Sequence, residues 1–157
     1  MKPSLLFAAA LLACAAFADA QTMSYGTPIT ADTAKKIAAP AIAEARKNQW
    51  TMAIAIVDTA GELVYFERMD DTQLGSVDVA ISKARSAARF KRPTKAFQDA
   101  LAAGGEGLRI LALDGAIPVE GGIPLVAGGK IVGAIGASGG TSPQDGVVAQ
   151  AAVNALK

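Results

Sequence analysis

The sequence contains no histidine. This absence excludes a histidine general base and the common zinc sites that use histidine ligands. It also argues against a serine nucleophile in the stretch Gly136-Ala137-Ser138-Gly139-Gly140, although this matches the G-x-S-x-G pattern, because such a serine needs a positioned base. We therefore interpret the stretch as a glycine-rich turn between a strand and a helix. The backbone N–H groups of Gly136, Ser138 and Gly139 would suit a carboxylate or phosphate.

Cysteine is nearly absent as well, since Cys14 is the only one in 157 residues. It lies in a leader-like segment in which Lys2 precedes an apolar run from Leu5 to Phe17, followed by Ala18-Asp19-Ala20. We predict a signal peptide over residues 1–20 and a single domain over residues 21–157, exported to the periplasm or secreted. A lipid anchor on Cys14 is the alternative.

Removal of this leader would leave a mature chain without cysteine. The mature domain would therefore have neither a disulfide framework nor a thiolate metal site. The apolar run itself is shorter than the roughly 20 residues that a transmembrane helix needs, so we expect no transmembrane segment after cleavage.

Aromatic residues and net charge are also low, at 5% and +1. The small net charge predicts no nucleic-acid partner. The scarcity of aromatic residues, together with many alanines and glycines, favours helices packed closely on a sheet over a large aromatic-lined cleft.

The hydrophobic pattern predicts an α+β fold with a five-stranded antiparallel sheet and packed helices, in a profilin-like or PAS-like layout. Thr30 is the expected cap of a first helix, which Pro40 should kink or divide. The other predicted segments are listed by residue range: strands at 51–57, 62–68, 108–113, 117–127 and 130–136, and helices at 76–91, 94–103 and 142–156. Turn residues at 58–61 and 128–129 predict two hairpins.

Basic residues gather between positions 83 and 95 without an acidic residue among them. Arg85, Arg89 and Arg92 follow helical spacing and should share one face, either as a solvated surface or as an anion clamp. Arg68-Met69-Asp70-Asp71 closes a predicted strand. Its two acids are turn formers or arginine partners, since adjacent carboxylates do not make an acid–base pair.

Several blocks together resemble the GlcG/HbpS family, whose domain is also described as haem-binding or haem-degrading. They are Asn48-Gln49-Trp50, VDTAGELVYFERMDD (57–71), KARSAARF (83–90), EGGIPLV (120–126) and GKIVGAIGASGGTSPQD (129–145). The resemblance runs from about residue 29 to residue 156. It implies a compact α+β domain that forms homo-oligomers and, in some members, binds haem.

Without histidine, haem iron would need a weak ligand such as methionine or tyrosine. The nearest candidates are Met52, Tyr65 and Met69. Haem binding should then be weak and spectrally atypical, with its propionates held by arginines 85, 89 and 92.

The sequence is compatible with three kinds of function. The first is a non-enzymatic binder of haem or a similar flat, anionic ligand. The second is a small cofactor-free enzyme or accessory protein for a carboxylic acid metabolite, with Arg68 or Lys83 orienting the substrate and Asp70 or Asp71 handling the proton. A purely structural oligomer or a partner of another exported protein is a further alternative.

Overall fold

The structure is a computed structural model, and it describes residues 23–156. The predicted signal peptide and Cys14 lie outside the described residues. The elements, in chain order, are α1 (Ala31–Lys47), β1 (Ala53–Val57), β2 (Leu63–Arg68), α2 (Ser76–Phe90), α3 (Thr94–Ala102), the 3-10 helix η1 (Gly105–Ala112), β3 (Gly122–Ala127), β4 (Lys130–Ser138) and α4 (Ser142–Ala155). No helix within residues 23–156 has the length and apolar character needed to cross a membrane.

Four strands form one antiparallel sheet in the order β2-β1-β4-β3. Both predicted hairpins are confirmed, since β1 pairs with β2 and β3 pairs with β4. The second hairpin turns at Gly128 and Gly129, whose φ angles of 55° and 73° suit glycine. The hairpins meet where β1 pairs with β4, which places β2 and β3 at the two edges.

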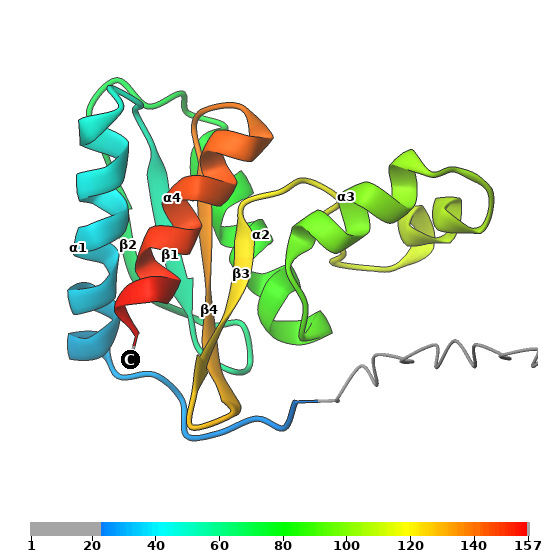
Figure 1. The fold of residues 1–157 in the computed structure, drawn as a ribbon, viewed down its shortest axis with the longest axis horizontal. Coiled ribbons are helices and arrows are strands. Elements are labelled where there is room, and N and C mark those ends of the chain that lie inside the picture. The colour runs from blue at the N-terminus through cyan, green and yellow to red at the C-terminus, as the bar shows by residue number, and fades with distance from the viewer. Residues whose placement is uncertain (1–22, 157) are drawn as a thin grey trace, which may run out of the picture.

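The sheet is covered on both faces, as Figure 1 shows, by α1 with α4 on one side and α2 on the other. The central strand β1 is buried along its whole length. Ile54 and Ile56 join the core under α1 and α4, whereas Ala53 and Ala55 face α2. This confirms the sequence-based expectation of a strand with two buried faces.

The first helix is capped as predicted, because the backbone N–H of Thr33 donates to the Thr30 hydroxyl at 3.2 Å. Its division into two pieces at Pro40 is wrong, since α1 continues through this residue. The missing N–H weakens the helix locally. Burial of one helical stripe, which includes Ile37, Ala41 and Ala45, holds it on the sheet.

The last helix, α4, begins at Ser142, the first residue of the predicted range, and its cap is Thr141. Pro143 lies in the first turn, where a missing backbone N–H is tolerated. The backbone N–H of Thr141 donates to the Gln144 side chain at 2.8 Å, which completes a capping box.

The sheet has four strands, so the prediction of five is wrong. Residues 108–113 were expected to form a strand but lie largely in η1, and the next strand begins only at Gly122. Leucine, arginine and alanine favour helical backbone, and Ile110 is the only β-branched residue in this stretch. Gly104 and Gly105, with φ angles of 69° and 55°, also turn the chain away from the sheet.

The segment from Thr94 to Gly121, which we call the arm, projects from the body of the molecule (Figure 1). It comprises α3, η1 and the return to β3. Three leucines of the arm are exposed: Leu108, Leu111 and Leu113.

Candidate functional site

A groove lies between α1 and the edge strand β2. Its cavity volume is about 670 Å³, within the usual range of small-molecule sites. An apolar wall from α1 consists of Ala39, Ile42 and Ala43. The polar lining residues are Lys35, Arg46, Lys47, Tyr65 and Glu67. An apolar wall beside three cations and a tyrosine suits a flat ligand that carries carboxylates.

Tyr65 is held by its neighbour on the same face of β2. Its hydroxyl donates to Oε2 of Glu67 at 2.6 Å. This hydrogen bond, then burial and then the charge of Glu67, raises the pKa of Tyr65 to about 12. Tyr65 is therefore a neutral phenol near pH 7, with its oxygen fixed at the groove.

A smaller hollow of about 300 Å³ adjoins the groove at the end of β2. It shares Arg46 and Glu67 with the groove and adds Arg68, Met69 and Asp70. The structure thus brings together four residues named from sequence along one continuous surface depression: Tyr65, Arg68, Met69 and Asp70. Among residues 23–156, no cluster of three or more histidine, cysteine or acidic side chains is placed to bind a metal ion.

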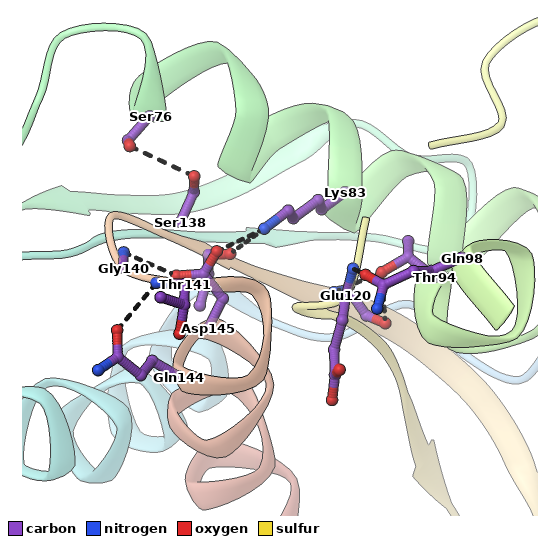
Figure 2. A network of polar contacts seen from close by, with 12 residues as sticks. Ser76, Lys83, Thr94, Gln98, Glu120, Ser138, Gly140, Thr141, Gln144 and Asp145 are labelled. Carbon is purple, nitrogen blue, oxygen red and sulfur yellow. Dashed lines mark hydrogen bonds and ion pairs between the residues drawn. The ribbon is translucent and has the colours of Figure 1, made fainter. Parts of the chain in front are cut away.

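Lys83 and Asp145 form an ion pair inside the protein, 62 residues apart in sequence (Figure 2). Lys83 Nζ lies 2.7 Å from Oδ2 of Asp145, and the side chains are 1% and 4% exposed. Lys83 also donates to the carbonyl of Ala137 at 3.2 Å, and the N–H of Gly140 donates to Asp145 at 3.0 Å. Burial raises the pKa of Asp145, against the lowering effects of Lys83 and of the N–H groups of Gly140 and Gly139.

This arrangement gives Lys83 a role other than the expected one. The lysine ties α2 to the first turn of α4 across the end of β4. A fully buried and paired ammonium does not orient a substrate at the surface.

The glycine-rich turn is also packed inside. Ser138 is 4% exposed, and its hydroxyl donates to that of Ser76 at 3.3 Å. A Cβ on Gly136 would lie 2.0 Å from the carbonyl of Ala80, and one on Gly139 would lie 2.1 Å from the carbonyl of Thr51. These glycines allow close contact between backbones, so helix α2 and the residues just before β1 fill the space that was predicted to hold an anion.

Two of the three clamp arginines hold the β1–β2 turn. Arg85 donates to the carbonyl of Gly61 at 3.1 Å and Arg89 donates to that of Ala60 at 3.0 Å. Arg92 lies beyond the end of α2 and directly after Lys91, whose backbone is left-handed. The three arginines therefore do not share one helical face. None of the three lines the groove or the adjoining hollow.

Met52 is fully buried among the core residues under α1 and α4. Of the three predicted iron ligands, Tyr65 and Met69 therefore lie at the surface depression and Met52 does not. The cations Lys35, Arg46 and Lys47 were not singled out from sequence. Their spacing along the polar side of α1 was the available signal, but it is shared by any solvated helix face.

The sequence from residue 29 to residue 154 matches the family model described as "Haem degrading protein HbpS-like". This chain belongs to the HbpS-like family. The match runs from before α1 to the last turn of α4, and it confirms the resemblance stated from the sequence blocks.

Named relatives agree with this HbpS-like assignment. The chain is 33% identical over 128 residues to a 15.0 kDa protein of the dhaT-dhaS intergenic region of Citrobacter freundii, with 80% of this chain and 90% of the relative covered. It is 37% identical over 95 residues to Protein GlcG of Escherichia coli K12, with coverage of 60% and 69%. The crystal structure of a PduOC–haem complex superimposes with a TM-score of 0.75 at 27% identity, covering 83% of this chain and 96% of that one.

Proposed function

We propose that this HbpS-like chain binds haem or a related flat, anionic tetrapyrrole in the groove between α1 and β2. The observation that carries the proposal is the composition of this groove, in which an apolar wall faces Tyr65 and three cations lie around it. The haem complex of PduOC supports the same ligand class. The proposal is for a binding protein, with no reaction assigned.

The side chains of the depression fit the chemistry of haem without histidine. Tyr65 would hold the iron through its oxygen after losing the phenol proton, and Met69 would offer a thioether sulfur; tyrosine and methionine are both known classes of axial ligand. Arg46 and Lys47, near the C-terminal end of α1, suit the propionates, because charged hydrogen bonds to carboxylates are the stronger kind. Haem would supply a redox-active iron, and the protein would set its ligand and exclude water from one ring face.

A haemin titration tests the proposal, followed by the Soret band and by quenching of Trp50, the only tryptophan. The double change Arg46→Ala with Lys47→Ala should weaken binding about tenfold or more, because charged hydrogen bonds contribute about 1.5–3 kcal/mol and 1.4 kcal/mol is about a factor of ten. The matched control is Arg89→Ala with Arg92→Ala, which removes two cations outside the groove.

Three outcomes decide among the alternatives. If only the Arg46 and Lys47 double variant binds haemin more weakly, the groove is the binding site. If only the Arg89 and Arg92 double variant binds haemin more weakly, the site lies at the arginines in and after α2. If the Soret band of the haemin complex changes in Tyr65→Phe but not in Met69→Ala, Tyr65 is the iron ligand. If haemin causes neither a Soret shift nor saturable quenching of Trp50, the haem proposal is wrong.

Export to the periplasm, or secretion, is part of the same proposal, based on the leader-like residues 1–20. We expect the exported protein to begin at Gln21. Intact mass spectrometry of the protein recovered outside the cytoplasm measures this directly. A mass that includes a lipid on Cys14 would show a membrane-anchored form instead.

We also propose that the protein is a homo-oligomer. A domain of this size without a disulfide has a modest core, and several leucines of the arm are exposed. Association would bury them. Light scattering at micromolar concentration should give more than the mass of one chain.

A second candidate function is favoured by the hollow at the end of β2. Arg46 and Arg68 line it together with Asp70, which offers two guanidinium groups for a carboxylate and one carboxyl for proton transfer. A cofactor-free enzyme acting on a carboxylic acid would use this hollow. Catalysed exchange of a carbon-bound proton of such an acid in heavy water, lost in Asp70→Asn, would favour this function over haem binding.

A further inference from the structure

We propose a second ligand site, at the base of the arm, for a small organic amine in its ammonium form. The site is a pocket of about 460 Å³ between the base of the arm, the start of β3 and the first turns of α4. It shares no lining residue with the α1–β2 groove. The proposal therefore goes beyond haem binding and does not depend on it.

The pocket combines apolar walls with one acidic side chain. The acid is Glu120, which is half-buried. Small-molecule sites have volumes of this order, and they are mainly apolar with a few polar groups that orient the ligand. The apolar lining residues are Pro93, Ile123, Pro143 and Val147.

The carboxylate of Glu120 is free to receive a ligand. The backbone N–H of this residue donates to Gln98 Oε1 at 2.8 Å, which fixes its position at the end of the arm. Within residues 23–156, its side chain takes part in no hydrogen bond or ion pair. Figure 2 shows the side chain pointing away from the buried Lys83–Asp145 pair. A cation in the pocket would be its partner.

Gly146 makes room for this carboxylate. It is a buried residue of α4, and glycine within a helix is less stable than alanine. A Cβ at this position would lie 2.5 Å from Oε1 of Glu120. The glycine thus lets the carboxylate lie directly against the helix, where any larger side chain would displace it.

Other polar groups around the pocket are either engaged already or are acceptors. The hydroxyl of Thr94 accepts from the N–H of Gly122 at 2.9 Å. Gln150 donates through Nε2 to Asn154 at 3.0 Å, which leaves its amide oxygen as an acceptor. The ligand must therefore supply the hydrogen-bond donors, as an ammonium group does with its three N–H bonds.

The charges around the pocket favour a cation. Lys95 also lines it, but its Nζ lies 2.7 Å and 2.8 Å from the two carboxylate oxygens of Asp99. Lys83 and Asp145, which lie behind the pocket wall, compensate each other. Among these groups the charge of Glu120 is left without a counter-charge, so the pocket is negative.

The start of α4 does not make the pocket an anion site. Pro143 has no backbone N–H, and the N–H of Asp145 donates to the carbonyl of Thr141 at 2.9 Å. The carboxylate of Asp145 also accepts from the N–H of Gly140. The positive end of the helix is therefore used inside the protein.

The test compares three probes of equal chain length: hexylammonium, hexanol and hexanoate. Saturation-transfer difference NMR at pH 7 measures the dissociation constant of each, and hexylammonium should bind most tightly. Glu120→Gln keeps the size of the side chain and removes its charge. It should weaken the binding of hexylammonium about tenfold or more, because hydrogen bonds between charged groups are the stronger kind.

A second variant tests the geometry, and a third is the matched control. Gly146→Ala leaves Glu120 in the chain but pushes its carboxylate out of place, so it should weaken the binding of hexylammonium several-fold. Glu62→Gln removes a carboxylate whose side chain is 67% exposed just before β2, outside the pocket, and should leave binding unchanged. Circular dichroism checks that each variant is folded.

The outcomes separate this site from the haem site. Equal binding of hexanol and hexylammonium, tighter binding of hexanoate, or equal losses in Glu62→Gln and Glu120→Gln would each overturn the amine site. Haemin bound first should leave the affinity for hexylammonium unchanged, whereas displacement by haemin would move the amine to the groove and overturn the proposal. A protein that binds haemin but not hexylammonium would lose this site and keep the proposed function.

Discussion

At the scale of single residues, burial separates two ion pairs of the same length. Lys83–Asp145 and Lys95–Asp99 both have an N–O distance of 2.7 Å. The first is inside the protein, while the side chains of the second are 51% and 60% exposed. Sequence reasoning placed Lys83 at a ligand site because it belongs to a run of basic residues. Its partner Asp145 lies 62 residues away, and no local pattern links the two.

Removal of one member of the buried pair should be costly. Lys83→Met leaves the carboxylate of Asp145 buried without its counter-charge, so we expect a loss of about 3–5 kcal/mol in the free energy of unfolding. Lys95→Met is the matched control, with an expected loss below about 1 kcal/mol, because an exposed i,i+4 pair contributes little. Urea denaturation followed by Trp50 fluorescence measures both. Equal losses for the two variants would contradict the structural role of Lys83.

The tyrosine at the groove makes a pH prediction. The pKa of Tyr65 is raised to about 12, so the folded state holds this proton more tightly than the unfolded chain. Its contribution to stability is present below the unfolded pKa of about 10 and is lost as the pH rises toward 12.

Phenolate absorbance of a Tyr25→Phe protein isolates this group, since the chain has two tyrosines. The titration should be centred near 12. Glu67→Ala removes the acceptor of the Tyr65 hydrogen bond, which is the largest cause of the shift, together with the negative charge, and should lower the pKa of Tyr65 toward its ordinary value. An unchanged midpoint in this variant would rule out Glu67 as the cause.

At the scale of elements, the parts with local signals were predictable. Gly128-Gly129 and the turn at residues 58–61 fixed both hairpins, and Thr30 marked the start of α1. The stretch 108–113 carries apolar residues but has no strand beside it to pair with. Whether such a partner is present depends on the tertiary arrangement. Apolar content alone therefore predicted a fifth strand where the chain forms η1.

The contact between α2 and the sheet depends on glycine. Gly122 and Gly136 face each other across β3 and β4, and both abut the backbone of α2. Gly136→Ala would place a Cβ 2.0 Å from the carbonyl of Ala80, which forces the helix outward. We expect a loss of about 1–3 kcal/mol or more in the free energy of unfolding.

Gly75→Ala is the control for this change. Gly75 has a φ of −60° and no heavy atom within 4 Å of an added Cβ. Because the backbone of Gly75 is already helical and an added methyl group meets nothing, its replacement should change the free energy of unfolding by no more than about 1 kcal/mol. Chemical denaturation of the two variants gives the comparison, and a Gly136→Ala protein as stable as the control would contradict close packing at this strand pair.

At the scale of the whole molecule, the candidate site was only partly visible in the sequence. Tyr65, Arg68 and Met69 could be named because they lie on, or directly after, the second strand of a recognisable hairpin. Lys35, Arg46 and Lys47 belong to a helix that precedes the hairpin, and they reach the groove because α1 lies over the edge strand. Their convergence depends on how helix and sheet pack, which residue spacing does not report.

Stability of the whole molecule should depend on protein concentration if chains associate through the exposed leucines of the arm. Association that involves only folded chains shifts the unfolding equilibrium by mass action, so the midpoint of thermal unfolding rises with concentration. The Leu111→Asp variant cannot bury its tip in a partner, and its midpoint should be the same at every concentration. Differential scanning calorimetry over a hundredfold range of concentration makes the comparison. A rise of equal size in both proteins would place the stabilising contact elsewhere on the molecule, because the tip of the arm would then contribute nothing to it.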